Sequence, residues 1–188
     1  ALSIAAGGSP STPADVVYSL DGGANWYAVD VDTMAAADVP TALACVAGYL
    51  VVLDQTGNSL HYASLDDFTT TPDVTWTEIT AGFVATAQPR DIWSLGSVAY
   101  IAGNGGYIYK LTDPAAGVTV LDAGTVLTDD LLAIHAISET KIIAAGTVNN
   151  LVDGGFGANS TDSVALSATT ASASTWFKFD FGVGASKL

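Results

Sequence analysis

Two histidines and one cysteine are the side chains of this sequence with the widest chemical range, as metal ligands, bases or nucleophiles. His61 alternates with Leu60 and Tyr62, and it shares no metal-ligand spacing with Cys45 or His135. No Gly-x-Ser-x-Gly turn is present to carry a catalytic serine. We therefore expect both histidines to have structural roles. Cys45 lies in an apolar run, which predicts a small buried core residue.

Acidic residues are the next candidates. Glycoside hydrolysis needs two carboxyl groups that flank the scissile bond. Glu78 and Glu139 are the only glutamates, and they occupy non-equivalent positions near predicted strand ends. Asp30, Asp32 and the adjacent residues 129–130 could bind calcium weakly through oxygen. They lack EF-hand spacing, so we expect solvated turn residues there. The glycine-rich run 103–106 opens no helix, which argues against a phosphate site. We predict no enzyme activity, no metal and no cofactor.

The charge of the chain excludes further classes of ligand. Its 188 residues include 19 acidic and 5 basic side chains, for a net charge of −14. A phosphate backbone needs a basic stripe, so we expect no nucleic-acid binding. Anionic membrane surfaces are disfavoured for the same reason. No apolar run approaches the roughly 18 residues of a membrane span, so no membrane insertion is expected.

Short strand-like segments recur along the chain with a period of about 45 residues. Four such strands per repeat are typical of a β-propeller blade. We predict an all-β fold of four-stranded antiparallel blades in a single repeat domain, residues 1–188. Its units cover about 1–30, 40–80, 88–122 and 131–181. The first unit lacks its first strand, and the exposed sheet edge that results favours a partner or a longer parent chain.

One hairpin contains a motif whose residues each have a clear role in forming the turn. The run from Ser19 to Trp26 fits the pattern Ser-x-Asp-x-Gly-x-x-Trp. Asp21 can accept hydrogen bonds from backbone N–H groups of its own hairpin. Gly23 permits the positive φ of a tight turn. Trp26 is expected to fill the space between neighbouring sheets. The later hairpins keep only parts of this pattern.

This pattern resembles the Asp-box (BNR) motif of repeat β-propellers. Such hairpins occur in sialidases, sortilin-type receptors and photosystem assembly factors, with relatives among phage structural and bacterial surface proteins. The resemblance implies a fold rather than a function. A sialidase would need an arginine cluster for the substrate carboxylate, and Arg90 is the only arginine.

We therefore predict a non-catalytic structural or protein-interaction module of a larger extracellular or virion-type assembly, with other protein subunits as partners. Trp93, Tyr107 and Tyr109 are the candidate interaction aromatics. The main alternative is a carbohydrate-binding or degraded glycosidase-like propeller that binds a glycan. The second alternative is an assembly factor for a membrane complex, against which the few basic residues argue.

Overall fold

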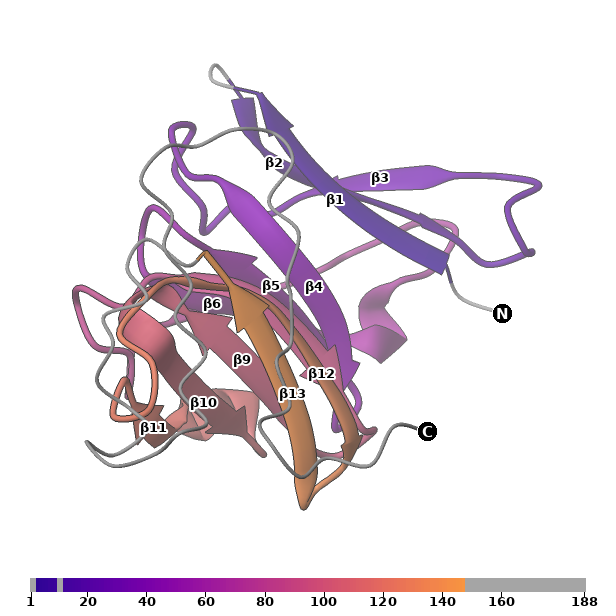
Figure 1. The fold of residues 1–188 in the computed structure, drawn as a ribbon. Coiled ribbons are helices and arrows are strands. Elements are labelled where there is room, and N and C mark those ends of the chain that lie inside the picture. Colours follow the sequence, from indigo (N-terminus) through magenta and orange to yellow (C-terminus); the bar gives the residue numbers. More distant parts are fainter. Residues whose placement is uncertain (1–2, 10–11, 148–188) are drawn as a thin grey trace, which may run out of the picture. The chain divides into compact units, whose positions relative to one another are not determined.

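The computed structural model describes residues 3–9 and 12–147, which form strands joined by turns (Figure 1). The first sheet contains β1 (Ser3–Ser9), β2 (Thr12–Ser19) and β3 (Tyr27–Asp30). The second contains β4 (Pro40–Val46), β5 (Tyr49–Asp54), β6 (Ser59–Ser64) and β7 (Thr77–Ile79). The third contains β8 (Pro89–Ser94), β9 (Ala99–Gly103), β10 (Tyr107–Leu111) and β11 (Thr119–Ala123). The fourth contains β12 (Leu131–Ser138) and β13 (Lys141–Gly146). The described residues also include the short 3-10 helices η1 (Leu65–Asp67), η2 (Asn104–Gly106) and η3 (Pro114–Ala116).

The predicted fold class is confirmed in its coarser part, an all-β chain with four-stranded antiparallel sheets. Strand order within every sheet follows the chain. No closed propeller is found within the described residues, so the propeller arrangement of the blades stays a prediction. The fourth predicted unit runs to residue 181, and its last two predicted strands, 164–169 and 175–179, lie outside the described residues.

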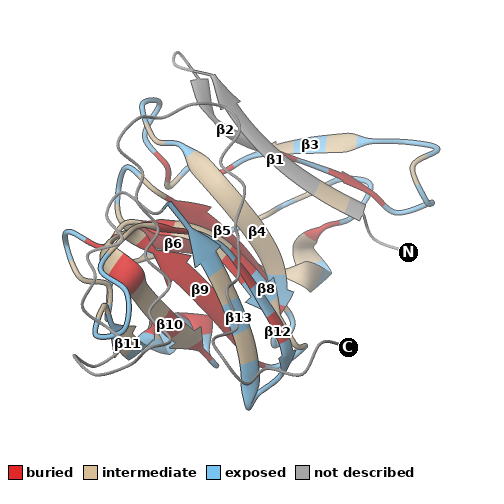
Figure 2. Ribbon diagram, viewed as in Figure 1, coloured by how far each residue is buried: buried red, intermediate tan, exposed pale blue. Residues whose placement is uncertain are grey.

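The apolar core lies between successive sheets. Leu50 and Val52 of β5 pack with Tyr18 of the first sheet, whereas Val51 and Leu53 pack with residues of the third. Successive side chains of a strand point to opposite faces, so both faces of β5 are buried. β9 is likewise buried along its whole length. Figure 2 shows β5, β6 and β9 as the buried strands of the described region. Each interior sheet therefore needs a neighbour on both faces.

A β-bulge recurs in the first strand of the second, third and fourth sheets. The register shifts across Thr41 in β4, Arg90 in β8 and Leu132 in β12. Each of these is the second residue of its strand. A bulge bends the strand and increases its local twist. The repeat is thus present in the backbone, as a bulge at the same position of each sheet, as well as in the recurring sequence segments.

Hydrogen bonds join neighbouring sheets near these first strands. The Ile134 N–H of β12 donates to Asp91 Oδ2 of β8 at 2.8 Å. Between the second and third sheets, the Ala47 N–H donates to the Gly96 carbonyl at 2.9 Å. A buried backbone donor such as the Ile134 N–H needs such a partner. These contacts therefore align the sheets as well as hold them together.

The prediction that Cys45 is a buried core residue is wrong, because its side chain is exposed. The neighbouring Val46 is fully buried in the core. Alternation along β4 sends these two side chains to opposite faces. The face that carries Cys45 is covered at Leu43, which packs against the core between the first two sheets, but it is open at Cys45 near the end of the strand.

Candidate functional site

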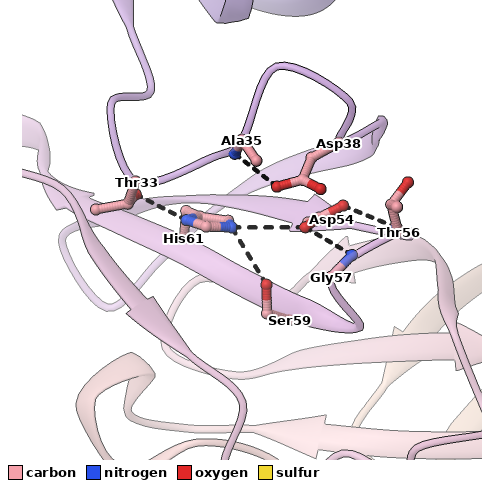
Figure 3. Close-up of polar contacts among 8 residues, drawn as sticks. All are labelled: Thr33, Ala35, Asp38, Asp54, Thr56, Gly57, Ser59 and His61. Atoms are coloured by element: carbon pink, nitrogen blue, oxygen red, sulfur yellow. Dashed lines mark hydrogen bonds and ion pairs between the residues drawn. The ribbon is translucent and has the colours of Figure 1, made fainter.

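A buried polar cluster surrounds His61 and joins a loop to two strands (Figure 3). His61 Nδ1 lies 2.7 Å from Thr33 Oγ1, in the loop between β3 and β4. His61 Nε2 lies 3.2 Å from Ser59 Oγ and 3.9 Å from Asp54 Oδ2. Ser59 and His61 are fully buried and Asp54 is 1% exposed. Burying such groups is costly unless they are paired, so the cluster is held by mutual contact.

The turn between β5 and β6 positions the carboxylate. Asp54 ends β5, and its two oxygens accept hydrogen bonds from the backbone N–H groups of Thr56 and Gly57, each at 2.8 Å. A Cβ at Gly57 would lie 2.2 Å from Asp54 Oδ2, so only glycine fits there. Asn58 completes the turn at a φ of 54°, a left-handed conformation that asparagine tolerates. The turn thereby fixes the carboxylate beside His61.

Two opposing effects determine the ionisation of Asp54. Burial acts to raise the pKa of this carboxyl, since it disfavours the charged form. The nearby His61 ring, 3.9 Å away, and the hydrogen bonds from the backbone N–H groups of Gly57 and Thr56 act to lower it. The net result is a pKa below the ordinary value of an aspartate. The cluster therefore stabilises a buried carboxylate anion.

The cluster contains the residue types of a hydrolytic triad but not its geometry. In a triad the serine and the carboxylate occupy opposite nitrogens of the imidazole ring. Here Ser59 and Asp54 both lie on the Nε2 side, and Nδ1 faces Thr33. All three triad-type side chains are buried. The arrangement is suited to tying the β3–β4 loop to the β5–β6 hairpin. Alternation predicts that Ser59 and His61 share a face, but it does not predict the approach of Asp54 or Thr33.

The hairpin that follows β2 has a dense local network. Ser19 Oγ accepts from the Gly23 N–H at 2.7 Å and donates to Asp21 Oδ1 at 2.9 Å. Asp21 Oδ1 also accepts from the Asn25 backbone N–H at 2.9 Å. Hydrogen bonds from the Asn25 backbone, the Asn25 side chain and Ser19 lower the pKa of Asp21 to about 2. The carboxylate therefore organises the turn in its charged form.

Trp26 does not fill the space between sheets, and that expectation is wrong. Its side chain is 53% exposed. The indole Nε1 donates to the Gly23 carbonyl at 3.1 Å, so the ring folds back over its own turn. Between the first two sheets the aromatic filling comes from Tyr18, Phe68 and Trp76. The motif positions the backbone of the hairpin but does not set where its tryptophan packs.

The three predicted interaction aromatics have different environments. Tyr109 is fully buried, and its hydroxyl donates to the Ala87 carbonyl at 3.2 Å, so it is unavailable to a partner. Tyr107 is half-buried and stacks on Tyr109 with ring centroids 5.9 Å apart. Trp93 is 38% exposed, and its ring lies 3.8 Å from that of His135, centroid to centroid. Of the three, Trp93 is the best exposed for contact.

The acidic candidates are dispersed. Glu78 lies on β7, whereas Glu139 follows β12 and pairs with Lys110 at 3.2 Å. Asp130 Oδ1 accepts from the Gly105 N–H at 3.0 Å, so this residue holds the turn at η2. Among residues 3–9 and 12–147, no group of three His, Cys, Asp or Glu side chains could hold a metal ion. The same part of the chain has no helix of the length and apolarity that crossing a membrane requires.

An apolar face is exposed on the fourth sheet. One face of β12 and β13 packs on the third sheet through Ile134, Ala136, Ile142 and Ala144. The opposite face carries exposed residues, and Figure 2 shows these two strands as less buried than β9. Ile137 and Ile143 are 60% and 56% exposed. We call the set Ala133, His135, Ile137, Lys141, Ile143 and Ala145 the outer face of the fourth sheet.

Comparisons with known proteins found no family model, no curated protein and no solved structure that matches this chain.

Proposed function

We propose that this chain is a non-catalytic structural and protein-interaction module of a larger extracellular or virion-type assembly. The observation that carries the proposal is the outer face of the fourth sheet. Ile137 and Ile143 are each more than half exposed, and they lie on a strand pair whose other face is core. Exposed apolar faces on soluble domains are typical of protein–protein contacts.

The buried cluster supports the same proposal. Its serine, histidine and aspartate are the best-equipped side chains for hydrolysis in the described residues, and they are 0–1% exposed. A catalytic group needs contact with its substrate. A cluster that ties a loop to a hairpin instead gives the rigid scaffold that an assembly subunit needs.

A carbohydrate-binding function is the second candidate, and one observation favours it. Trp93 is 38% exposed, and its ring contacts that of His135 at an interplanar angle of 42°. An exposed indole of this kind can lie against the apolar face of a sugar ring. The pair is small, however, and no further exposed aromatic contacts either ring among the described residues.

The test combines a glycan array with photo-crosslinking of the full chain in its native setting. A photo-crosslinking amino acid at Ile137 is expected to form adducts with another polypeptide, whereas the same residue at Val126, which is 89% exposed in a loop, is expected to form few. The array is expected to show no binding. Glycan retention that is lost in Trp93→Ala would overturn the proposal in favour of carbohydrate binding.

A further inference from the structure

Negative charge is distributed unevenly along the chain. Residues 1–39, which include the first sheet and the loop after it, contain five aspartates. Residues 40–88, which include the second sheet, contain five further acids, and neither segment has a lysine or an arginine. Residues 89–147 combine six acids with three bases, and residues 148–188 bring a net charge of only −1. The first two sheets are therefore neighbours of like charge, with no lysine or arginine of their own to balance it.

Apolar contacts hold these two sheets together against that charge. The ring of Tyr18 on β2 lies edge-on to Phe68, with centroids 5.2 Å apart, and the Tyr18 hydroxyl donates to the Thr69 carbonyl. Phe68 also contacts Trp76, which is 5% exposed. Phe68, Thr69 and Trp76 all belong to the loop between β6 and β7. The exposed Asp73 lies in the same loop, so the segment that contacts the first sheet also carries an acid.

The fourth sheet provides an internal comparison with the first. Within the described part of the chain, each of these sheets packs on one neighbour only, and the cross-strand partners Val17 and Ala28 of the first sheet are exposed. The charges of the two sheets differ, because residues 131–146 contain one acid and one base. Lys110 of the third sheet also pairs with Glu139 at 3.2 Å. Electrostatic attraction thus acts between the third and fourth sheets, whereas repulsion acts between the first and second.

We propose that the first sheet opens from the second as a separate unit, and that ionic strength controls how often it opens. Opening moves five acids away from five others, so like-charge repulsion favours the open state. Salt screens this repulsion, because the Debye length falls from about 30 Å at about 10 mM to about 8 Å at about 150 mM. The apolar contacts around Tyr18 are not screened, so added salt favours the closed state. Opening exposes Tyr18, Phe68 and Trp76, which are aromatic side chains of the kind enriched in protein interfaces.

The test is amide hydrogen exchange of the full chain at neutral pH, in about 10 mM and about 150 mM sodium chloride. Exchange of a protected amide needs local opening, so its rate reports how often each sheet opens. The higher salt is expected to slow exchange in β2 and β3 by about 10-fold. Exchange in β12 and β13 is expected to become faster by less than about 3-fold, because salt screens the attraction between Lys110 and Glu139. Unchanged exchange in β2 and β3, or equal slowing in the first and fourth sheets, would overturn the proposal.

Two matched charge reversals test the electrostatic cause. Asp73→Lys places a cation in the loop that contacts the first sheet, and it is expected to slow exchange in β2 and β3 by about 5-fold at low salt, although no residue of those strands is changed. Asp129→Lys makes the same change between β11 and β12, and it is expected to alter exchange in β2 and β3 by less than about 2-fold.

The effect of Asp73→Lys is expected to be largely lost at the higher salt, and circular dichroism establishes that both variants are folded. If Asp73→Lys lowers the stability, Asp73→Asn replaces it, with an expected effect of about 2-fold at low salt. Equal effects of the reversals at Asp73 and Asp129 on β2 and β3 would contradict electrostatic control of the first sheet. An effect of Asp73→Lys that persists at the higher salt would contradict it as well.

Discussion

His61 Nε2 and Asp54 Oδ2 lie 3.9 Å apart in a region where both side chains are at most 1% exposed. Asp54 comes from the end of β5 and His61 from the middle of β6. Breaking a buried pair by removing one partner leaves the other group without compensation. The stability of this chain should therefore depend on the cluster more strongly than on any exposed charge.

Removal of the imidazole is the direct test of that dependence. We expect His61→Ala to lower the free energy of unfolding by about 3–5 kcal/mol, because it leaves Asp54 buried without its partner and opens a cavity. His135→Ala is the matched control, since His135 is exposed, and we expect it to cost less than about 1 kcal/mol. Urea denaturation of both variants measures the difference. Equal costs would contradict a structural role for the cluster.

Acid should weaken the same cluster. The pKa of Asp54 is lower in the folded chain than its ordinary value. A carboxyl with a depressed folded-state pKa contributes stability that is fully present above its unfolded-state pKa, about 3.9, and is lost as the pH falls through the folded-state value. We therefore expect the stability advantage of the wild type over Asp54→Asn to be constant near neutral pH and to shrink below about pH 4.

Denaturation of both proteins at a series of pH values measures this advantage. The lowered pKa values of Asp21 and Asp122 affect both proteins alike and cancel in the difference. An advantage that grows towards acid would contradict the assignment of Asp54 as a stabilised anion.

In the hairpin after β2, we expect substitution of the serine to destabilise the chain more than substitution of the tryptophan. Ser19 is fully buried and bonds both Gly23 and Asp21, so Ser19→Ala is expected to cost about 1–3 kcal/mol. Trp26 is 53% exposed, so Trp26→Ala is expected to cost less than about 1 kcal/mol. Trp76, 5% exposed, is the matched comparison, and Trp76→Ala is expected to cost about 3–5 kcal/mol. If Trp26→Ala lowered the free energy of unfolding as much as Trp76→Ala, the expectation that Trp26 packs between sheets would be restored.

Sequence periodicity predicted the strands well because each strand is a local pattern. The apolar run 51–54, the alternating segment 60–66 and the turn residues between them are sufficient to predict β5 and β6. Which face of a strand is buried depends on the neighbouring sheets, and periodicity does not specify where these sheets pack. Cys45 and Trp26 were expected to be buried for their apolar character, and both are exposed.

The candidate site was less predictable than the fold. Thr33 lies 28 residues before His61 in the chain, and no local pattern links them. One signal was present: Asp54 ends its strand at the position where β9 and β13 end in Gly103 and Gly146. A carboxylate at a repeat position otherwise occupied by glycine indicates a special turn. Its pairing with His61 follows only from the register of β5 and β6.

The seam between the third and fourth sheets provides the last prediction. Asp91 Oδ2 accepts the Ile134 N–H at 2.8 Å, beside the bulge of β8. Asp91→Ala would leave this backbone donor unpaired next to the buried Ile134 side chain, at a cost of about 1–3 kcal/mol. Asp91→Asn keeps an oxygen acceptor and is expected to restore most of that loss. Amide hydrogen exchange of Ile134 measures the local effect directly, and we expect faster exchange in Asp91→Ala than in Asp91→Asn. Unchanged protection of that amide in Asp91→Ala would show that the carboxylate does not hold the two sheets in register.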